Sequence, residues 1–263
     1  MSGDDEVRAA AERLIRAAQT RQTCPPVRDL IGSSDLAAAY AVQDAIAAWR
    51  TAEGAVVVGR KIGLTSTAVQ EQLGVDQPDL GILFEDTQYA DGETVPSSRL
   101  MQPRAEAEIA FVLKEDLADG DLGLDQVAAA VDYAVAAIEV ADSRVAGWDI
   151  TFADTVADNA SSGVYVLGNE RKTLDEFTPR DVEMTMTVTG QEVSTGSGAA
   201  CLGDPLVAVQ WLALKARDFG QPLRAGQVIL SGALGPMRAV APGATATATI
   251  AALGSVTLHF TEG

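Results

Sequence analysis

Arg104-Ala-Glu-Ala-Glu-Ile-Ala-Phe-Val-Leu is the segment that best predicts how this chain folds. Successive side chains of an extended strand project to opposite faces, so Glu106 and Glu108 would share one face, about 7 Å apart along the backbone. The other face would carry Ala107, Ile109, Phe111 and Leu113. This alternation indicates a β-strand over residues 104–113 with one face on a hydrophobic core.

The segments on either side also predict strands, with few helices between them. Residues 55–64 predict a buried strand, and residues 86–96 predict a turn-rich stretch with short strands. A helix over 124–137 is expected to run into a strand over 138–141, and another helix is expected over 205–220. Val and Thr alternations predict further strands over 182–188, 228–232, 244–251 and 255–260. Without regular strand–helix alternation, the pattern favours a mixed sheet, rolled or sandwiched, over a Rossmann or TIM arrangement.

The N-terminal part predicts two helices that form an arm ahead of the sheet. Residues 5–20 are strong helix formers with acids in the first turn, and Cys24-Pro-Pro ends that helix. Ser34 is the expected N-cap of a second helix, which Gly54 ends. Apolar residues recur along this second helix at helical spacing: Leu36, Ala39, Val42, Ile46 and Trp49.

The composition disfavours several classes of function. Of the 263 residues, 47% are hydrophobic, which allows a substantial core, and no apolar run approaches the roughly 20 residues that span a bilayer. Lysine and arginine number 19 against 37 acidic residues, a formal net charge of -18. Such a charge repels nucleic-acid phosphates and anionic lipids. It also repels small carboxylate substrates, so a site for them would need a local positive charge, most simply a bound cation.

The cysteines and the N-terminal residues favour the cytoplasm. Cys24 and Cys201 are far apart and outside any CxxC spacing, so they indicate neither a disulfide framework nor a zinc site. The start of the chain, Met1-Ser-Gly-Asp-Asp-Glu, lacks the basic and apolar segments of a signal peptide. We therefore expect a soluble intracellular protein.

A third acid, Glu139, indicates a chemical role for the paired glutamates. Glu139 interrupts an apolar run that is expected to be buried. An unpartnered buried carboxylate costs several kcal/mol, so it needs either an arginine such as Arg144 or a shared metal ion. Two acids on one strand would, by themselves, also fit a solvent-facing edge. Together, Glu106, Glu108 and Glu139 supply the oxygen ligands that Mg²⁺ or Mn²⁺ prefers.

Lys61 and Asp79 are the candidates for proton transfer. Lys61 is unique among the lysines in lying in an apolar strand, between Gly59 and Gly63. A lysine near a dication in a low-dielectric site would have a lowered pKa and could exchange protons near neutrality. A strand-end lysine that reaches solvent is the plainer interpretation. Asp79 follows a proline in Gly74-Val-Asp-Gln-Pro-Asp-Leu-Gly, where most aspartates only cap turns.

Three other polar features carry weaker signals. The single histidine, His259, lies in the terminal alternating strand and fits packing or surface, which leaves little for a catalytic triad or a zinc site. The glycines of Ser231-Gly-Ala-Leu-Gly-Pro indicate a tight turn whose amides could bind an anion. Residues 154–162 are dense in polar groups and favour a plain loop.

Five segments together make the chain similar to a known family. They are Lys61-Ile-Gly-Leu-Thr-Ser, Gly74-Val-Asp-Gln-Pro-Asp-Leu-Gly-Ile-Leu-Phe, Gln102-Pro-Arg-Ala-Glu-Ala-Glu-Ile-Ala, Val156-Ala-Asp-Asn-Ala-Ser-Ser-Gly and Leu230-Ser-Gly-Ala-Leu-Gly-Pro. With these segments in order, the chain from about residue 37 to 260 resembles the 2-hydroxypenta-2,4-dienoate (2-keto-4-pentenoate) hydratases of the fumarylacetoacetate-hydrolase-like superfamily.

The resemblance implies a fold, an assembly and roles for individual residues. The fold is α+β: a mixed β-roll of the fumarylacetoacetate-hydrolase C-terminal type over residues 55–263, with a helical arm over 1–54. The assembly is a homo-oligomer built on pentamers, with a downstream aldolase or a sister decarboxylase as candidate associates. The matching positions are Glu106, Glu108 and Glu139 for Mg²⁺ or Mn²⁺, Lys61 for the active-site lysine, Asp79 for the acid of the nearby loop, and Ser161 and Ser231 for neighbours of the substrate carboxylate.

The reaction that the resemblance implies is metal-dependent hydration of 2-hydroxypenta-2,4-dienoate, or a close homologue, to 4-hydroxy-2-oxopentanoate, as in meta-cleavage catabolism of aromatic compounds or steroids. The sister enzyme, 4-oxalocrotonate decarboxylase, shares the metal, the lysine and the fold, but residues 76–84 look more like those of hydratases. An acylpyruvate hydrolase would need a base such as histidine, and His259 is poorly placed for that role. The alternative from another class is a non-catalytic acidic subunit that supports a partner enzyme.

Overall fold

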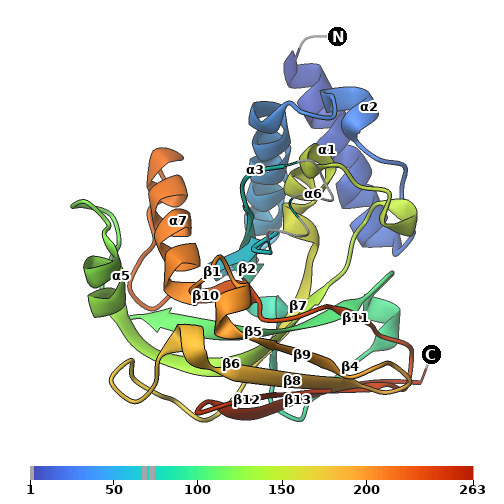
Figure 1. The fold of residues 1–263 in the computed structure, drawn as a ribbon. Coiled ribbons are helices and arrows are strands. Elements are labelled where there is room, and N and C mark those ends of the chain that lie inside the picture. The colour runs from blue at the N-terminus through green and yellow to red at the C-terminus, as the bar shows by residue number, and fades with distance from the viewer. Residues whose placement is uncertain (1–2, 67–69, 71–74, 263) are drawn as a thin grey trace.

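The computed structural model describes residues 3–66, 70 and 75–262 and shows an α+β chain with two β-sheets (Figure 1). Gly74, at the start of one family-like segment, lies outside the described residues. The α-helices are α1 (Gly3–Thr20), α2 (Arg28–Ile31), α3 (Leu36–Ala52), α5 (Leu124–Ala130), α6 (Phe152–Ala157) and α7 (Pro205–Asp218). The strands are β1 (Val57–Gly63), β2 (Asp79–Phe84), β3 (Gln88–Ala90), β4 (Thr94–Val95), β5 (Arg104–Leu113), β6 (Val131–Ala141), β7 (Ser162–Leu167), β8 (Glu183–Val188), β9 (Ser194–Ser197), β10 (Val228–Ala233), β11 (Arg238–Ala239), β12 (Thr245–Ile250) and β13 (Gly254–Phe260).

The predicted mixed sheet is present and is rolled. Its eight strands include the path β2-β1-β10-β5-β6-β7-β3, and β11 pairs with β5. Strand β1 runs parallel to β10 and antiparallel to β2. The sheet curves so far that β2, at one edge, contacts β7 near the other. A second sheet of five strands, ordered β4-β13-β12-β8-β9, lies against it, while α1, α2, α3 and α6 gather at the opposite end of the molecule (Figure 1).

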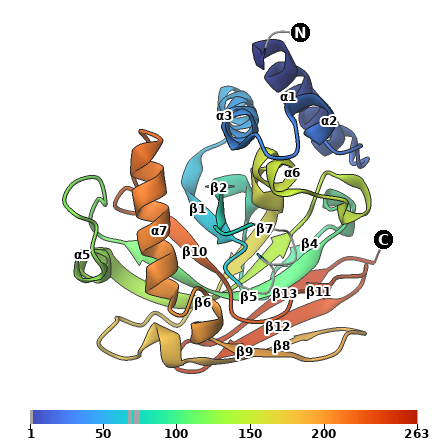
Figure 2. The same ribbon diagram turned by 45° about the horizontal axis from the view of Figure 1, so that its top comes forward.

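Both faces of the central strands β5 and β6 are buried. On the outer face, Ile109, Phe111 and Ile138 belong to the main core shared with the second sheet and with α7. Figure 2 shows α7 along the outside of the rolled sheet, beside α5. On the inner face, Ala110 and Val135 belong to a separate apolar cluster inside the roll. The inner face is therefore a compartment largely removed from solvent.

The helix predicted over residues 124–137 is wrong in its second half. Helix α5 ends at Ala130, and β6 begins at Val131. A strand that is buried on both faces lacks polar alternation, so periodicity cannot distinguish it from a buried helix. The β-branched or aromatic residues Val131, Tyr133 and Val135 each pair with a residue of β5, and side chains of this kind favour strands.

The predicted N-terminal helices are present as α1 and α3, which pack on each other, and α3 also packs on α6. The N-cap of α3 is Asp35 rather than Ser34, because the Asp35 carboxylate accepts a hydrogen bond from the amide of Ala38 at 3.0 Å. Asp35 directly precedes the first helical residue, Leu36, so Ser34 lies one position too early. In the described part of the chain, no helix has both the length and the apolar character needed to cross a membrane.

The plain loop predicted over residues 154–162 is wrong. Most of this segment is helix α6 followed by a short 3₁₀ turn over Asn159–Ser161. The polar groups are buried hydrogen-bond partners. The amide and hydroxyl of Thr151 both donate to the Asp154 carboxylate, at 2.9 and 2.8 Å, and Asp154 is 0% exposed. Asp154 also accepts hydrogen bonds from the amides of Val27 and Arg28, so this segment is fixed to the N-terminal helical arm instead of facing water.

Candidate active site

Three glutamates meet on the inner face of the rolled sheet. Glu106 of β5 lies directly opposite Glu139 of β6, and Glu108 follows two residues later on the same face. Opposed residues of an antiparallel pair have Cβ atoms about 5 Å apart. Glu108 and Glu139 are 0% and 1% exposed, respectively. The structure therefore brings together the three carboxylates that the sequence singled out.

Lys61 is the cation of this cluster. It lies in β1, and its ammonium nitrogen is 3.1 Å from Oε1 of Glu139. The two side chains are 5% and 1% exposed, so water screens this ion pair little. Arg144, the alternative partner considered for Glu139, pairs with Asp158 instead. The interpretation of Lys61 as a strand-end lysine that reaches solvent is wrong.

The carboxylates around Lys61 control its charge. Burial alone would lower the pKa of Lys61, but Glu139, Asp79, Glu106 and Glu108 outweigh burial and raise that pKa above its ordinary value. The lowered pKa expected beside a dication therefore does not hold for the side chains by themselves. The carboxylates therefore favour the ammonium form of Lys61 in this arrangement.

The glutamates repel one another. Burial, followed by the charge of Glu139, raises the pKa of Glu106 to about 7 against the opposing effect of Lys61. Burial, together with Glu139 and Glu106, also raises the pKa of Glu108 well above its ordinary value. Like charges in one buried site resist simultaneous ionisation. A bound divalent cation would reverse this effect by favouring the charged forms.

The donor atoms of the cluster fit a hard divalent cation. Oε1 of Glu108 is buried and has no hydrogen-bond partner among the described residues, and Oε1 of Glu139 already attracts the ammonium cation of Lys61 at 3.1 Å. Carboxylate oxygens are the ligands that Mg²⁺ and Ca²⁺ prefer. Within residues 3–66, 70 and 75–262, no three His, Cys, Asp or Glu side chains are already gathered as they are around a bound ion. The ammonium of Lys61 supplies the positive charge beside Glu139 instead.

Asp79 completes the charged cluster from β2. It pairs with Gly63 of β1, and a Cβ atom at Gly63 would lie 2.2 Å from Oδ1 of Asp79, so glycine leaves the room that this carboxylate needs. The hydroxyl of Thr155 donates to Oδ2 at 3.1 Å, whereas Oδ1 has no hydrogen-bond partner in the described chain. Burial raises the pKa of Asp79 despite the opposing charge of Lys61. The interpretation of Asp79 as a simple turn cap is wrong.

The end of β10 supplies a hydroxyl and an amide. The hydroxyl oxygen of Ser231 is buried without a hydrogen-bond partner in the ranges described. The amide of Gly232, at a φ of +111°, donates to Oε2 of Glu108 at 2.8 Å. The anion that this turn binds is therefore a carboxylate of the chain itself. The thiol of Cys201 donates to the Ser231 carbonyl at 2.9 Å, a contact that no sequence spacing indicated.

Ser161 ends a turn with an uncommon backbone conformation. Asn159, Ala160 and Ser161 have φ angles of 55°, 50° and 51°. This left-handed region costs an L residue about 1–2 kcal/mol. Ser161 is 3% exposed, and its hydroxyl donates to Oδ2 of Asp158 at 3.4 Å. The turn contacts β1 and β2, the strands that carry Lys61 and Asp79.

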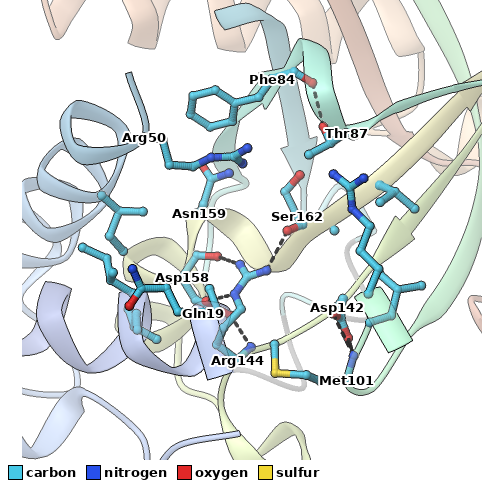
Figure 3. Close-up of a pocket in the computed structure, with 18 of the residues that line it drawn as sticks. Gln19, Arg50, Phe84, Thr87, Met101, Asp142, Arg144, Asp158, Asn159 and Ser162 are labelled. Carbon is cyan, nitrogen blue, oxygen red and sulfur yellow. Dashed lines mark hydrogen bonds and ion pairs between the residues drawn. The ribbon is translucent and has the colours of Figure 1, made fainter. Parts of the chain in front are cut away.

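Arg144 and Asp158 brace this turn from its other side (Figure 3). The Arg144 guanidinium donates to the carboxylate and the carbonyl of Asp158, and to the carbonyl of Ser162. Burial raises the pKa of Asp158 against the opposing charge of Arg144. Both residues line a cavity of about 270 Å³. In the described part of the chain, neither Lys61 nor the three glutamates line this cavity, so it is separate from the carboxylate cluster.

His259 lies in β13 of the second sheet, where its Nδ1 is 2.9 Å from the hydroxyl of Thr245. The packing interpretation of this residue is confirmed. An acylpyruvate hydrolase that depends on a histidine base therefore gains no support from the structure.

Comparison with known proteins relates the chain to characterised sequences. Residues 50–261 match the family described as fumarylacetoacetate (FAA) hydrolase C-terminal. A protein from Pseudomonas putida named TodF product hydratase is 51% identical over 97% of this chain and 96% of its own. A 2-keto-4-pentenoate hydratase from Burkholderia vietnamiensis is 50% identical over 100% of both chains.

A solved structure shares both the fold and a substantial part of the sequence. It is 4-oxalocrotonate decarboxylase from Pseudomonas putida, in complex with magnesium and adipate. The TM-score is 0.93 at 36% identity, and the match covers 98% of each chain. The predicted α+β fold of this type is confirmed.

Proposed function

The chain belongs to the fumarylacetoacetate hydrolase C-terminal family, and we propose that it is a metal-dependent hydratase of the 2-keto-4-pentenoate type. Its substrate is 2-hydroxypenta-2,4-dienoate or a close homologue, and its product is 4-hydroxy-2-oxopentanoate. The observation that carries this proposal is the cluster of Lys61, Asp79 and three glutamates on one face of the roll, in which every member except the half-buried Glu106 is buried. The hydratase relatives, at 51% and 50% identity over nearly the whole chain, support the same reaction.

Glu106, Glu108 and Glu139 would hold the divalent ion, which we propose to be Mg²⁺ or Mn²⁺. When bound, the ion supplies positive charge to the carboxylate and the 2-oxygen of the substrate. The unpartnered Oε1 of Glu108 and the directly opposed carboxylates of Glu106 and Glu139 support this assignment. The amide of Gly232 holds the other oxygen of Glu108, which leaves Oε1 free for a ligand.

Lys61 and Asp79 move the protons. The dienol must lose a proton from its C2 hydroxyl and gain one at C5 to become the α,β-unsaturated 2-oxo acid; water then adds at C4, and C3 takes a proton. Lys61 is the donor, because its ammonium carries N–H groups into the carboxylate cluster, 3.1 Å from Glu139. Asp79 is the acceptor through its free Oδ1, since burial raises its pKa and makes it a better base than an ordinary aspartate.

Ser231 and Ser161 orient the substrate through its carboxylate. The Ser231 hydroxyl is buried without a partner in the described chain and is free to donate to an anion. A small carboxylate needs such donors, because the protein carries a net charge of -18. The apolar cluster inside the roll, which includes Leu83 and Leu230, excludes bulk water from the same face.

Decarboxylation of 4-oxalocrotonate is the second candidate, since the solved decarboxylase matches at a TM-score of 0.93. Its 36% identity is lower than the 50% of the hydratase relative. Assaying both substrates with Mg²⁺ separates the two activities. We expect loss of dienoate absorbance with 2-hydroxypenta-2,4-dienoate and no CO₂ release from the dicarboxylate. The opposite pattern would assign the decarboxylase, and no turnover of either substrate would favour a non-catalytic subunit.

The assembly and the setting are also proposals. We propose a homo-oligomer built on pentamers, in the cytoplasm, in which residues 1–54 form a helical arm and residues 55–263 form the catalytic roll. The product is a 4-hydroxy-2-oxo acid, which an aldolase can cleave, so association with a downstream aldolase or with a sister decarboxylase would be consistent with the chemistry. Light scattering of the purified protein tests the oligomeric state.

A further inference from the structure

One side chain fixes the left-handed turn Asn159–Ser161 to strand β2. The carboxamide oxygen of Asn159 accepts a hydrogen bond from the amide of Ile82 at 2.8 Å, and its nitrogen donates to the carbonyl of Ile82 at 2.9 Å. The side chain thus engages both backbone groups of a single residue, as a neighbouring strand would. This two-bond contact is the Asn159 clamp.

The turn needs such a clamp because its conformation is unfavourable. In the left-handed region the Cβ atom of an L residue approaches the following carbonyl oxygen. Asn159 tolerates that region, but Ala160 and Ser161 do not share this tolerance. Strain of this kind persists only where the surroundings over-determine it, and it clusters at functional sites.

Gly81 of β2 lies where the turn and the stem of Lys61 approach each other. A Cβ atom at Gly81 would lie 2.7 Å from the carbonyl oxygen of Asn159, 3.1 Å from Cγ of Lys61 and 3.2 Å from Cβ of Ala160. The turn and the lysine stem therefore meet over one glycine. A shift of the turn would move the wall against which the Lys61 side chain packs.

We propose that Asn159 is a positioning residue for the reaction. Its clamp on Ile82 sets the distance of the turn from β2, and so fixes Ala160 against the stem of Lys61 and Ser161 beside the substrate carboxylate. Arg144 braces the same turn from the opposite side, through Asp158. This inference rests on the proposed hydratase function and adds a residue that touches neither the metal site nor the reacting atoms.

Asn159→Gly is the decisive variant. Glycine adopts positive φ freely, so the variant removes the clamp without opposing the left-handed backbone. We expect kcat to fall by about 100-fold, because a displacement of about 1 Å can cost that much, while Mg²⁺ affinity measured by calorimetry stays unchanged. A role limited to folding would lower the thermal midpoint and leave kcat of the folded protein at the wild-type level. That result would overturn the proposal.

Gly81→Ala tests the same contact from the other strand. The added methyl group would meet the Asn159 carbonyl, so it pushes the turn away from β2 while the clamp residue remains. We expect a loss of kcat similar to that of Asn159→Gly. Wild-type kcat in this variant would contradict the proposal even if Asn159→Gly failed to fold.

Asn169→Gly is the matched control. The carboxamide of Asn169 donates to Asp91 at 3.1 Å on the exposed surface, so its loss should leave kcat and KM unchanged. If the wild-type protein hydrates no dienoate, the proposed function fails by itself. The clamp is then tested by calorimetry with Mg²⁺ and oxalate: weaker oxalate binding in Asn159→Gly supports the positioning role, and equal binding refutes it.

Discussion

Two groups of buried carboxylates in this chain meet opposite surroundings. Asp154, at the start of α6, accepts hydrogen bonds from the amides of Val27, Arg28 and Thr151, from the Thr151 hydroxyl and from the Arg28 guanidinium. On the inner face of the roll, Asp79 and Glu108 each keep one oxygen without a hydrogen-bond partner in the described ranges, while Oε1 of Glu139 meets the ammonium of Lys61. Both oxygens of Asp154 therefore have hydrogen-bond donors, whereas the inner-face carboxylates leave acceptor oxygens unused.

The pKa shifts of Asp154 and of the inner-face carboxylates follow this difference in hydrogen bonding. Burial would raise the pKa of Asp154, but hydrogen bonds from Thr151 and Arg28 outweigh it and lower that pKa. Burial raises the pKa values of Asp79 and Glu108, and the partners they have do not offset it. Asp154 is therefore stabilised in its charged form, whereas the carboxylates of the cluster favour a bound cation or a proton.

The largest expected effect concerns Lys61, the cation among the inner-face carboxylates. Lys61→Met removes the proposed proton donor, so kcat for dienoate hydration should fall by about 10²- to 10⁴-fold. Lys114→Met, at an exposed position, is the control and should keep wild-type kcat. Circular dichroism would verify that both variants are folded. Turnover by the Lys61 variant at the wild-type rate would remove this lysine from the mechanism.

The next effect concerns metal affinity. Glu108→Gln takes away one proposed ligand and should weaken Mg²⁺ binding by about 100-fold or more, measured by calorimetry. The metal-free variant should be no less stable than the metal-free wild type, because a buried like charge is removed. Asp154→Asn is the control for this measurement and should leave Mg²⁺ affinity unchanged. Equal affinity in the Glu108 variant would break the distinction between the two groups.

Substitution of Asp154, whose carboxylate is fully hydrogen-bonded, should lower stability and leave activity unchanged. Asp154→Asn weakens the charge-assisted hydrogen bonds to Arg28, and the free energy of unfolding should fall by about 2 kcal/mol. The Arg28 side chain is 27% exposed, so solvent screens part of the ion pair and the loss should stay modest. The kcat of the folded variant should equal that of the wild type. A loss of kcat without a loss of stability would contradict a structural role.

The stability from Asp154 should also depend on pH. Its pKa in the folded protein lies below the unfolded value of about 3.9, so the contribution is present above that value and is lost as pH falls through the folded pKa. Denaturant unfolding of the wild type and of Asp154→Asn should therefore differ by a constant amount near neutral pH. The difference should shrink in strong acid. If the difference in unfolding free energy widened in acid, the pKa of Asp154 would be raised in the folded protein instead of lowered.

The smallest effect tests the arm. Asp35→Ala removes the N-cap of α3 and should cost about 1 kcal/mol of unfolding free energy. Ser34→Ala should change it by less than about 0.5 kcal/mol, because no hydrogen bond of the Ser34 side chain caps the helix. Thermal unfolding of both variants checks the assignment. A larger loss from Ser34→Ala would restore the cap that the sequence suggested.

Part of the roll was predictable because polar and apolar residues alternate along some strands. The acids and apolar residues of residues 104–113 alternate, and the strand β5 has those bounds. Strand β6 was mistaken for a helix over much of its length because it is buried on both faces and shows no alternation. Local patterns succeed where polar and apolar side chains alternate, as in β5, and they fail where a strand carries apolar side chains on both faces.

The site was predictable in its residues more than in its contacts. Spacing placed Glu106 and Glu108 on one face, but the partner of Glu139 is Lys61, which lies in a strand two places from β5 in the sheet. The clamp of Asn159 on Ile82 joins residues 77 positions apart. Such contacts depend on how the sheet closes, which no local window of sequence contains.

The central claim is that the inner-face carboxylates bind the divalent ion required for hydration. The most direct measurement is turnover of 2-hydroxypenta-2,4-dienoate by chelator-treated protein during titration with Mg²⁺, with Glu106→Gln in parallel. Wild-type turnover should be absent without metal and should rise to saturation with added Mg²⁺, while the variant stays inactive at the same concentrations. Full turnover by the chelated wild type, or by Glu106→Gln, would contradict the account.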